Sequence, residues 1–225
     1  RKFINEIGKK IYKDWNPEKM DMWVRLTYLG SGRQVGRSCL LLHTPNSKVL
    51  LDCGINPAIT EGQERFPYLN ISEIGDINTI DAIILSHAHT DHSALIPYLF
   101  KMGYRGPIYM TEPTRDISAL LALDFIGVAY KQAASPLYKA EDIKEMVRHS
   151  ICLDYGMVYD ITPDMRITFY NAGHVLGSAQ VHINIGNGLH NFVYGADTKY
   201  AKTRLLDPAV NYFPRVETLT IEATY

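Results

Sequence analysis

The sequence SHAHTDH, residues 86–92, places three histidines and one aspartate within six consecutive positions. It follows DAIILS (81–86), an apolar run that predicts a buried strand, so the histidines stand where the chain leaves a sheet. The 225 residues contain only eight histidines, and a protein core accommodates at most an occasional hydrogen-bonded imidazole. We therefore predict that this loop binds metal. His87 and His89 would point to one side and Asp91 and His92 to the other, which makes two adjacent sites.

Two later segments are candidates for the remaining ligands. Zinc accepts imidazole nitrogen and carboxylate oxygen and usually has about four ligands, more than the loop alone provides for two ions. His174 lies between a predicted strand and a glycine-flanked turn in NAGHVLGS (171–178), and Asp197 ends another strand in YGADT (194–198). A carboxylate at position 197 can bridge two cations, as two-metal hydrolases require.

The hydrophobic periodicity predicts an α/β sandwich whose chemistry lies in loops at strand ends. Pro113 falls in the first turn of a long helix, and Gly186-Asn187-Gly188 forms a hairpin turn. We predict strands in residues 23–30, 39–44, 48–54, 81–86, 107–111, 165–172, 179–186 and 190–196, and helices in residues 3–13, 93–103, 117–132 and 140–150.

Composition excludes several classes of protein. No apolar run approaches the roughly 20 residues of a membrane-spanning helix, and no secretory signal follows Arg1, so we expect a cytoplasmic protein. Cys39, Cys53 and Cys152 have no paired spacing, which favours buried small hydrophobes over disulfides or a cysteine zinc site.

The net charge of -1 argues against a basic field over the whole surface, so any contact with nucleic acid must be local. Two clusters of basic residues offer such a contact, although a solvated charged face is the simpler interpretation of either alone. The first is Lys9, Lys10 and Lys13, and the second is Lys199, Lys202 and Arg204.

The motifs in their order resemble a known family. HxHxDH after a strand, then GHxxGS and a strand ending in aspartate, resembles the metallo-β-lactamase fold from about residue 22 onward. Within that superfamily, the segments LLDCG (50–54), SHAHTDHSALIPYL (86–99), AGHVLGSA (172–179) and IEATY (221–225) are similar to the β-CASP nucleases. The blocks at 37–57 and 204–225 are closer still to archaeal homologues of the endonuclease subunit of the cleavage and polyadenylation specificity factor.

This resemblance implies an αββα sandwich and a role for each motif residue. His87, His89 and His174 would hold the first of two zinc ions, Asp91 and His92 would hold the second, and Asp197 would bridge them. Asp52 would orient the ligand loop through hydrogen bonds, and Glu222 would support the catalytic acid.

One motif departs from the family pattern, and four histidines lie outside it. The chain has Gly195-Ala196-Asp197 where the family commonly has Thr-Gly-Asp, so the aspartate is kept while its neighbour gains a methyl group. The histidines that match no ligand position, and that we expect to be structural or exposed, are His43, His149, His182 and His190.

The resemblance implies a zinc-dependent endoribonuclease in which a hydroxide bridging two zinc ions attacks a phosphodiester of single-stranded RNA. Its expected role is RNA 3′-end processing or transcription termination in an archaeal cytoplasm. HxHxDH alone does not exclude a glyoxalase-like thioester hydrolase or a β-lactamase. A metal-free scaffold subunit is the third alternative.

We expect the sequence to be part of a longer polypeptide, since it lacks a starting Met and stops after a strand-like run. Residues 1–21 would be a linker from an upstream domain, and residues 22–225 the N-terminal part of the metallo-β-lactamase domain. The resemblance implies upstream KH domains that bind RNA, a homodimer, and a downstream β-CASP domain. A missing second-metal ligand and a general acid, both histidines, would also lie downstream.

Overall fold

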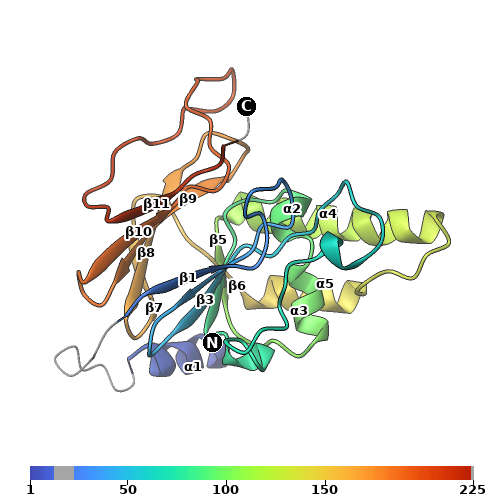
Figure 1. Cartoon of the computed structure of the whole chain (residues 1–225), viewed down its shortest axis with the longest axis horizontal. Coiled ribbons are helices and arrows are strands. Elements are labelled where there is room, and N and C mark those ends of the chain that lie inside the picture. The colour runs from blue at the N-terminus through green and yellow to red at the C-terminus, as the bar shows by residue number, and fades with distance from the viewer. Residues whose placement is uncertain (13–22, 224–225) are drawn as a thin grey trace.

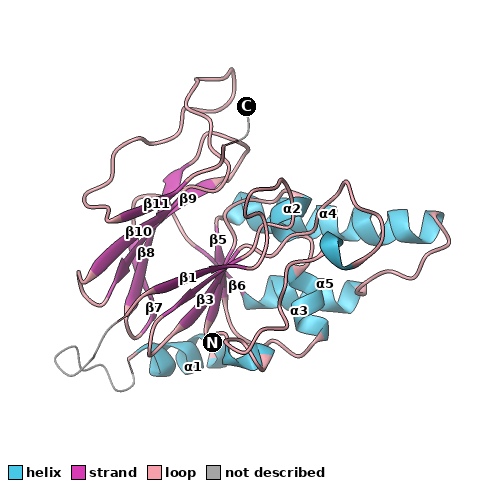
Figure 2. Ribbon diagram, in the orientation of Figure 1, coloured by secondary structure: helices cyan, strands magenta, loops and turns pink. Residues whose placement is uncertain are grey.

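Two β-sheets lie face to face in the computed structural model, which describes residues 1–12 and 23–223 (Figure 1). Lys13, the rest of the expected linker to residue 21, and the last two residues of the IEATY block lie outside the described residues. Helices gather on the outer side of one sheet, as Figure 2 shows. The predicted α/β sandwich is therefore confirmed.

The first sheet has the order β1-β2-β3-β4-β5-β6. Its strands are β1 (Arg25–Tyr28), β2 (Leu40–His43), β3 (Lys48–Leu51), β4 (Ala82–Ile84), β5 (Ile108–Met110) and β6 (Ser150–Cys152). β1, β2 and β3 pair antiparallel, whereas β3, β4, β5 and β6 pair parallel. Because β3 and β4 are parallel, the residues that follow them, Asp52 and the SHAHTDH loop, leave the sheet at the same edge.

The second sheet has the order β11-β10-β9-β8-β7. Its strands are β7 (Val158–Thr162), β8 (Met165–Asn171), β9 (Ala179–Ile185), β10 (His190–Tyr194) and β11 (Thr218–Thr220). β9 pairs antiparallel with both β8 and β10, so β8 and β10 run in the same direction. His174 and Asp197, which follow these two strands, therefore also leave their sheet at one edge.

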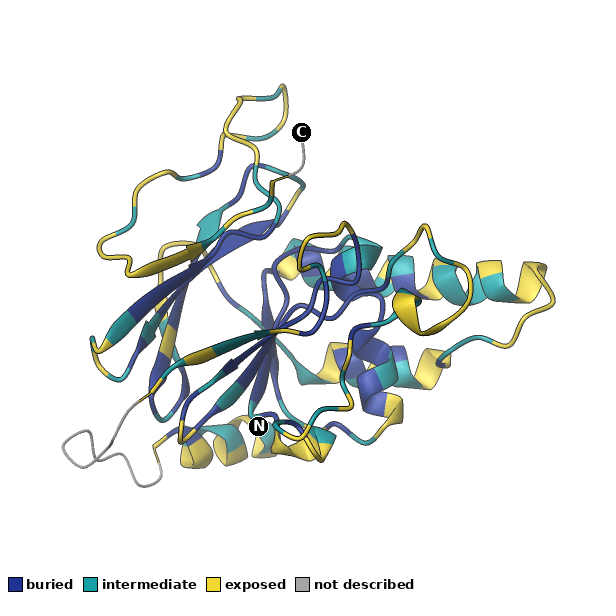
Figure 3. Ribbon diagram, in the orientation of Figure 1, coloured by how far each residue is buried: buried dark blue, intermediate teal, exposed yellow. Residues whose placement is uncertain are grey.

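Two hydrophobic cores hold the layers together. Along β2 and β3 successive side chains alternate: Leu41 and Leu50 face the helices, whereas Leu40 and Leu51 face the second sheet. The helices are α2 (Thr90–Ser93), α3 (Ile96–Lys101), α4 (Glu112–Lys131) and α5 (Ala140–His149). Figure 3 shows the buried residues gathered between the layers. At about 1.5–3 kcal/mol for each buried aliphatic side chain, these cores are the main source of stability.

The outer face of the second sheet is covered, in the described part of the chain, by the extended segment 210–217. The Nε2 atom of His182 lies 2.7 Å from the Arg215 carbonyl, and the Gln180 amide donates to the Val210 carbonyl at 2.7 Å. The ring of Phe213 lies edge-on to that of Tyr170, with centroids 5.2 Å apart. The segment thus packs as part of the domain.

Helix α1 (Lys2–Ile11) lies at one end of the sandwich (Figure 1). Ile11 is buried, the Phe3 ring packs against His149 with centroids 4.5 Å apart, and the Tyr12 hydroxyl donates to Asp160 at 2.9 Å. The predicted helix is therefore confirmed. The boundary between a linker and the domain at residue 21 stays a prediction.

The structure differs from the predicted elements in a few places. The helix expected at 93–103 forms two shorter helices, α2 and α3, and the long helix begins at Glu112, where the side chain of Thr111 accepts the backbone N–H of Thr114. Strands β6 and β7 were not predicted. Cys39 and Cys53 are buried, whereas Cys152 is only partly buried beside Arg115. Among the described helices, none has the length and apolar character to cross a bilayer.

Candidate metal centre

Four side chains from three loops converge at one edge of the sandwich. The His87 and His89 side chains come from the loop after β4, His174 from the loop after β8, and Asp197 from the loop after β10. One ligand atom from each lies within 4.8 Å of the other three. His87 is buried and the other three are partly exposed, so the group is open to solvent on one side.

The separations within this group fit a tetrahedral metal ion. The His89 Nδ1 atom lies 3.2 Å from His87 Nε2 and 3.1 Å from His174 Nε2. Asp197 Oδ2 lies 3.7 Å from His87 Nε2 and 3.4 Å from His174 Nε2. Ligands about 2.0–2.1 Å from a tetrahedral zinc ion stand roughly 3.3 Å apart, which is the range observed here. Three imidazole nitrogens and one carboxylate oxygen also form a donor set that suits zinc.

A second group shares Asp197 with the first. The Nε2 atom of His92 lies 3.3 Å from Asp197 Oδ1 and 3.6 Å from Asp91 Oδ2. The two oxygens of Asp197 therefore face different histidines, with Oδ2 toward His87 and His174 and Oδ1 toward His92. This is the arrangement that a bridging carboxylate between two cations requires.

The backbone before Asp197 has the conformation that the glycine of the family motif favours. Ala196 adopts a left-handed conformation with φ of 50°, which favours glycine and costs other residues roughly 1–2 kcal/mol. Ala196 thus adopts, with its additional methyl group, the left-handed conformation that the glycine of the family motif would favour. The aspartate still reaches both groups of histidines.

Asp52 lies under the ligand loop and is fully buried. Its Oδ1 accepts the backbone N–H of Ser86 at 2.7 Å. Its Oδ2 accepts the hydroxyls of Ser86 and Tyr194 and the Nδ1–H of His92, each at 2.7 Å. A buried carboxylate with this many donors fixes the loop in place, so the arrangement agrees with the orienting role predicted for Asp52.

These hydrogen bonds set the tautomers of two histidines. Because Asp52 is a carboxylate, His92 donates to it from Nδ1, so Nε2 is the nitrogen that would bind a metal after losing its proton. The Ser86 hydroxyl already donates to Asp52, so the contact of 3.0 Å between Ser86 Oγ and His87 Nδ1 requires the histidine to donate. His87 Nε2, the atom that faces His89 and Asp197, then carries the lone pair.

Electrostatics divide the histidines into two kinds. Burial, together with the neighbouring histidines, holds the pKa of His87 well below its usual value, and burial also lowers the pKa of His174. Burial acts in the same direction on His92, but hydrogen bonds with Asp197 and Asp52 outweigh it and raise the pKa of His92 to about 10. In the metal-free protein His92 is thus protonated, and metal binding at its Nε2 must release that proton.

Two close approaches position the ligand loops. Cβ on residue 54 would lie 1.8 Å from the carbonyl oxygen of Asp91, so only glycine fits where the β3 loop passes under the ligand loop. Gly177, in the loop that carries His174, has φ of 82°, and its carbonyl accepts the buried hydroxyls of Thr111 at 2.7 Å and Thr114 at 3.0 Å. The His174 loop is therefore attached to the first turn of α4.

Glu222 contacts the Asp197 loop through the backbone. Its Oε1 accepts the N–H of Thr198 at 2.9 Å, which holds the residue directly after Asp197. The predicted support of a catalytic acid by Glu222 stays a prediction. The observed contact makes Glu222 a positioning residue for the Asp197 loop.

The remaining four histidines lie outside the metal group found among the described residues. Three form hydrogen bonds elsewhere: His149 with the Gly106 carbonyl, His182 with the Arg215 carbonyl, and His190 with the Thr218 hydroxyl. His43 packs edge-on against Trp23. Their surroundings agree with the structural or exposed roles expected for them.

Several positioning residues were missed in the sequence. Ser86 could have been identified from the sequence, since it directly precedes the histidine loop. Tyr194 and Thr111 could not, because their contacts join segments that are 142 and 66 residues apart in the sequence. Ser38, whose hydroxyl lies 3.3 Å from His92 Nε2 across 54 residues, was missed for the same reason.

Replacing Asp52 with asparagine should destabilise the fold and weaken metal binding together. Asparagine tolerates the left-handed backbone at this position, where φ is 55°, so the change isolates the lost charge. Removing one partner of a buried ion pair costs about 3–5 kcal/mol, and losing a residue that orients a ligand lowers metal affinity by about 10- to 100-fold. Chemical denaturation and a zinc-chelator competition measure the two effects.

Asp81→Asn is the matched control for this experiment. Like Asp52, Asp81 accepts a backbone N–H, from Lys48 at 2.9 Å, but it is only partly buried and precedes β4 at the edge away from the ligands. This variant should retain the zinc affinity of the wild-type chain. Equal zinc affinities for Asp52→Asn and the wild-type chain would show that Asp52 does not orient the ligands.

Comparisons with known proteins agree with this geometry. Residues 41–220 match the family described as the metallo-beta-lactamase superfamily domain. Three archaeal relatives share the name "Transcription termination factor FttA". The chain is 49% identical to the protein of Methanothermobacter thermautotrophicus, 51% to that of Methanosarcina mazei and 49% to that of Pyrococcus abyssi. Each match covers 100% of this chain but only 35% of the relative, so the chain spans about a third of their length.

Solved structures share the fold at low sequence identity. A protein of unknown function from Enterococcus faecalis V583 superposes with a TM-score of 0.57 at 18% identity, over 79% of this chain and 44% of that protein. The metallo-beta-lactamase fold protein YhfI from Bacillus subtilis gives a TM-score of 0.51 at 21% identity, over 80% of this chain and 64% of YhfI. These likenesses concern the fold alone.

Proposed function

The chain belongs to the metallo-β-lactamase superfamily, and we propose that it carries the metal centre of a zinc-dependent endoribonuclease. The relatives named FttA, about half identical over the whole chain, confirm the archaeal relationship predicted from the sequence. Their name also supports a role for the complete protein in transcription termination or RNA 3′-end processing. Upstream KH domains and a homodimer stay predictions from the resemblance.

The observation that carries this proposal is the position of Asp197 between the three histidines of the first group and His92. Its Oδ2 lies 3.4 Å from His174 Nε2, and its Oδ1 lies 3.3 Å from His92 Nε2. A shared carboxylate of this kind supports two adjacent cation sites, which suit in-line displacement at a phosphodiester. His87, His89, His174 and Asp197 would hold the first ion, and Asp91, His92 and Asp197 the second.

Two zinc ions, when bound, would make a hydroxide available near neutral pH and neutralise charge that develops on the phosphate. The protein contributes the orientation of its own ligands. Asp52 holds His92 so that Nε2 faces Asp197, and Ser86 holds His87 so that its Nε2 faces His89. Low pKa values keep His87 and His174 in the neutral form that binds metal.

A substrate comparison with the complete protein tests this function. A labelled single-stranded RNA and a glutathione thioester are incubated separately with zinc-loaded protein, and the chelator-treated protein is the control. We expect the RNA to be cut, cleavage to disappear after chelation, and zinc to restore it. Thioester hydrolysis without RNA cleavage would instead support the glyoxalase-like alternative, and zinc-free protein from a zinc-replete preparation would support a scaffold.

A further inference from the structure

The segment directly after the Asp197 loop is strongly basic. Residues 199–206, KYAKTRLL, contain Lys199, Lys202 and Arg204 and no acidic residue, although the chain as a whole has a net charge of -1. We call these residues the basic loop. Such a local excess of positive charge is the kind of surface that attracts phosphate groups when the overall field is weak.

Backbone hydrogen bonds attach the base of the basic loop to the strand that leads to His174. The N–H of Lys199 donates to the Ala172 carbonyl at 2.9 Å, and the N–H of Ala209 donates to the Lys199 carbonyl at 2.8 Å. The Asn171 side chain donates to the carbonyl of Asp207 at 3.1 Å. The loop therefore has a fixed origin between two metal-ligand residues, His174 and Asp197.

The rest of the loop projects into solvent. Tyr200 is 55% exposed and Leu205 is 94% exposed. Lys202 approaches Asp207 at 3.9 Å, but both side chains are more than three quarters exposed, so solvent screens this pair. In Figure 1 the segment between β10 and β11, in orange to red, extends beyond the sheets. Its cations and its aromatic ring are thus available to a ligand.

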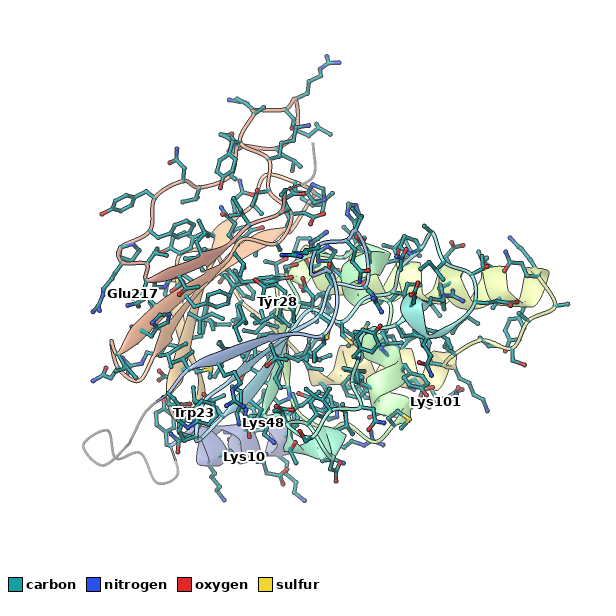
Figure 4. The ribbon with its side chains drawn as sticks, viewed as in Figure 1. Lys10, Trp23, Tyr28, Lys48, Lys101 and Glu217 are labelled. Atoms are coloured by element: carbon teal, nitrogen blue, oxygen red, sulfur yellow. The ribbon has the colours of Figure 1, made fainter. Side chains whose placement is uncertain are left out.

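The described residues of the other basic cluster, Lys9 and Lys10, lie at the opposite end of the molecule. Helix α1, which carries Lys9 and Lys10, packs its Phe3 against His149, the residue before β6, whereas the metal ligands follow the far ends of the neighbouring parallel strands. Figure 4 shows Lys10 at this end, away from the loops between β10 and β11. Among the described residues of the two clusters, those of the basic loop are the ones that adjoin the candidate metal centre.

We propose that the basic loop binds single-stranded RNA and directs it across the metal centre from the side of His174 and Asp197. This inference rests on the proposed function, because it assigns that same site its surface for RNA. Lys202 and Arg204 would contact phosphates, and Tyr200 would stack on a base. Alternating cations and an exposed aromatic ring are the features of surfaces that bind single strands without reading their sequence.

A pair of charge-reversal variants tests the inference in the complete protein. Lys202→Glu/Arg204→Glu changes the basic loop, and Lys9→Glu/Lys10→Glu makes the same change in charge on α1. Binding of a fluorescent oligouridylate is measured by anisotropy with chelator present, so that no RNA is cut. The loop variant should bind the RNA at least about tenfold more weakly than the wild-type protein. The slope of the logarithm of its binding constant against the logarithm of the salt concentration should be shallower by about 1.4, because each lost phosphate contact reduces that slope by about 0.7.

The α1 variant should bind like the wild-type protein, and Tyr200→Ala should weaken binding by about five- to 150-fold, the range for one stacked base. Because these side chains are exposed, the variants should retain the wild-type melting temperature. The inference is wrong if the wild-type protein does not bind the oligonucleotide, if both charge reversals act equally, or if the loop variant binds normally.

The same variants separate this inference from the proposed function. A loop variant that binds and cuts RNA like the wild-type protein would overturn the role of the loop and leave the nuclease proposal standing. Weaker RNA binding by the loop variant, combined with no RNA cleavage by the zinc-loaded wild-type protein, would support the loop as an RNA-binding surface and overturn the nuclease proposal.

Discussion

Replacing His89 with alanine should remove the first metal ion and abolish RNA cleavage by the complete protein. The Nδ1 atom of His89 lies 3.2 Å from His87 Nε2 and 3.1 Å from His174 Nε2, so it occupies one corner of the four-ligand group. Loss of a residue that only orients a ligand already lowers metal affinity by about 10- to 100-fold, and loss of a ligand should exceed that range. Zinc content after chelator dialysis measures the effect.

His182→Ala is the matched control. His182 is a nearly buried histidine in the second sheet, but its Nε2 lies 2.7 Å from the carbonyl of Arg215 on the outer face. This change should lower the free energy of unfolding by about 1–2 kcal/mol and leave the zinc content unchanged. Loss of zinc from His182→Ala together with retention by His89→Ala would mean that the metal centre is misassigned.

Replacing Asp197 with asparagine should impair catalysis far more than folding. The amide has one oxygen, so it presents an acceptor to one group of histidines and an NH2 donor to the other. It also brings no negative charge between two cations. Removal of a single electrostatic contribution at an active site commonly lowers kcat by about 10²- to 10³-fold, and we expect a loss of at least that size.

The melting temperature of this variant should fall by only a few degrees, because Asp197 is about one quarter exposed and the amide fills the same space. Single-turnover RNA cleavage by the complete protein, with zinc held in excess, gives the rate. A variant that cleaves RNA as fast as the wild-type protein would show that Asp197 does not bridge two metal ions.

Local patterns were sufficient to predict most of the fold. The strand 81–86 and the loop after it were predictable because a continuous apolar run ended at three histidines. The hairpin of β9 and β10 was predictable because apolar and polar residues alternate on both sides of a glycine-rich turn. β6 was not predictable, since it has three residues and follows α5 directly without a turn signal. β7 was missed because its residues do not alternate between buried and exposed: Val158 is exposed, whereas Ile161 and Thr162 are both buried.

The candidate ligands could be chosen from the sequence, whereas the residues that position them could not. His174 and Asp197 stand at strand ends beside glycines, which marks them without knowledge of the fold. The contact of Tyr194 with Asp52 depends on how the two sheets face each other across 142 residues. The hydrogen bond from Thr111 to the Gly177 carbonyl likewise depends on how the start of α4 meets the loop between β8 and β9. Such contacts follow from tertiary structure, and no local pattern in the sequence encodes them.

The structure also distinguishes two clusters that looked alike in the sequence. Both are short groups of lysine and arginine, and charge alone gave no reason to prefer either. Strand direction supplies the reason: β8 and β10 end at the metal centre, and the loop after β10 is the one that carries Lys199, Lys202 and Arg204.

Zinc titration of the 225-residue chain, followed by isothermal calorimetry, is the most direct test of the metal centre. The chain should bind two ions in separate events. The tight event belongs to His87, His89, His174 and Asp197, which together complete a tetrahedral shell. The weaker event belongs to Asp91, His92 and Asp197, where water must complete the shell and His92 must release a proton. Absence of zinc binding, or two equally tight events, would contradict this assignment.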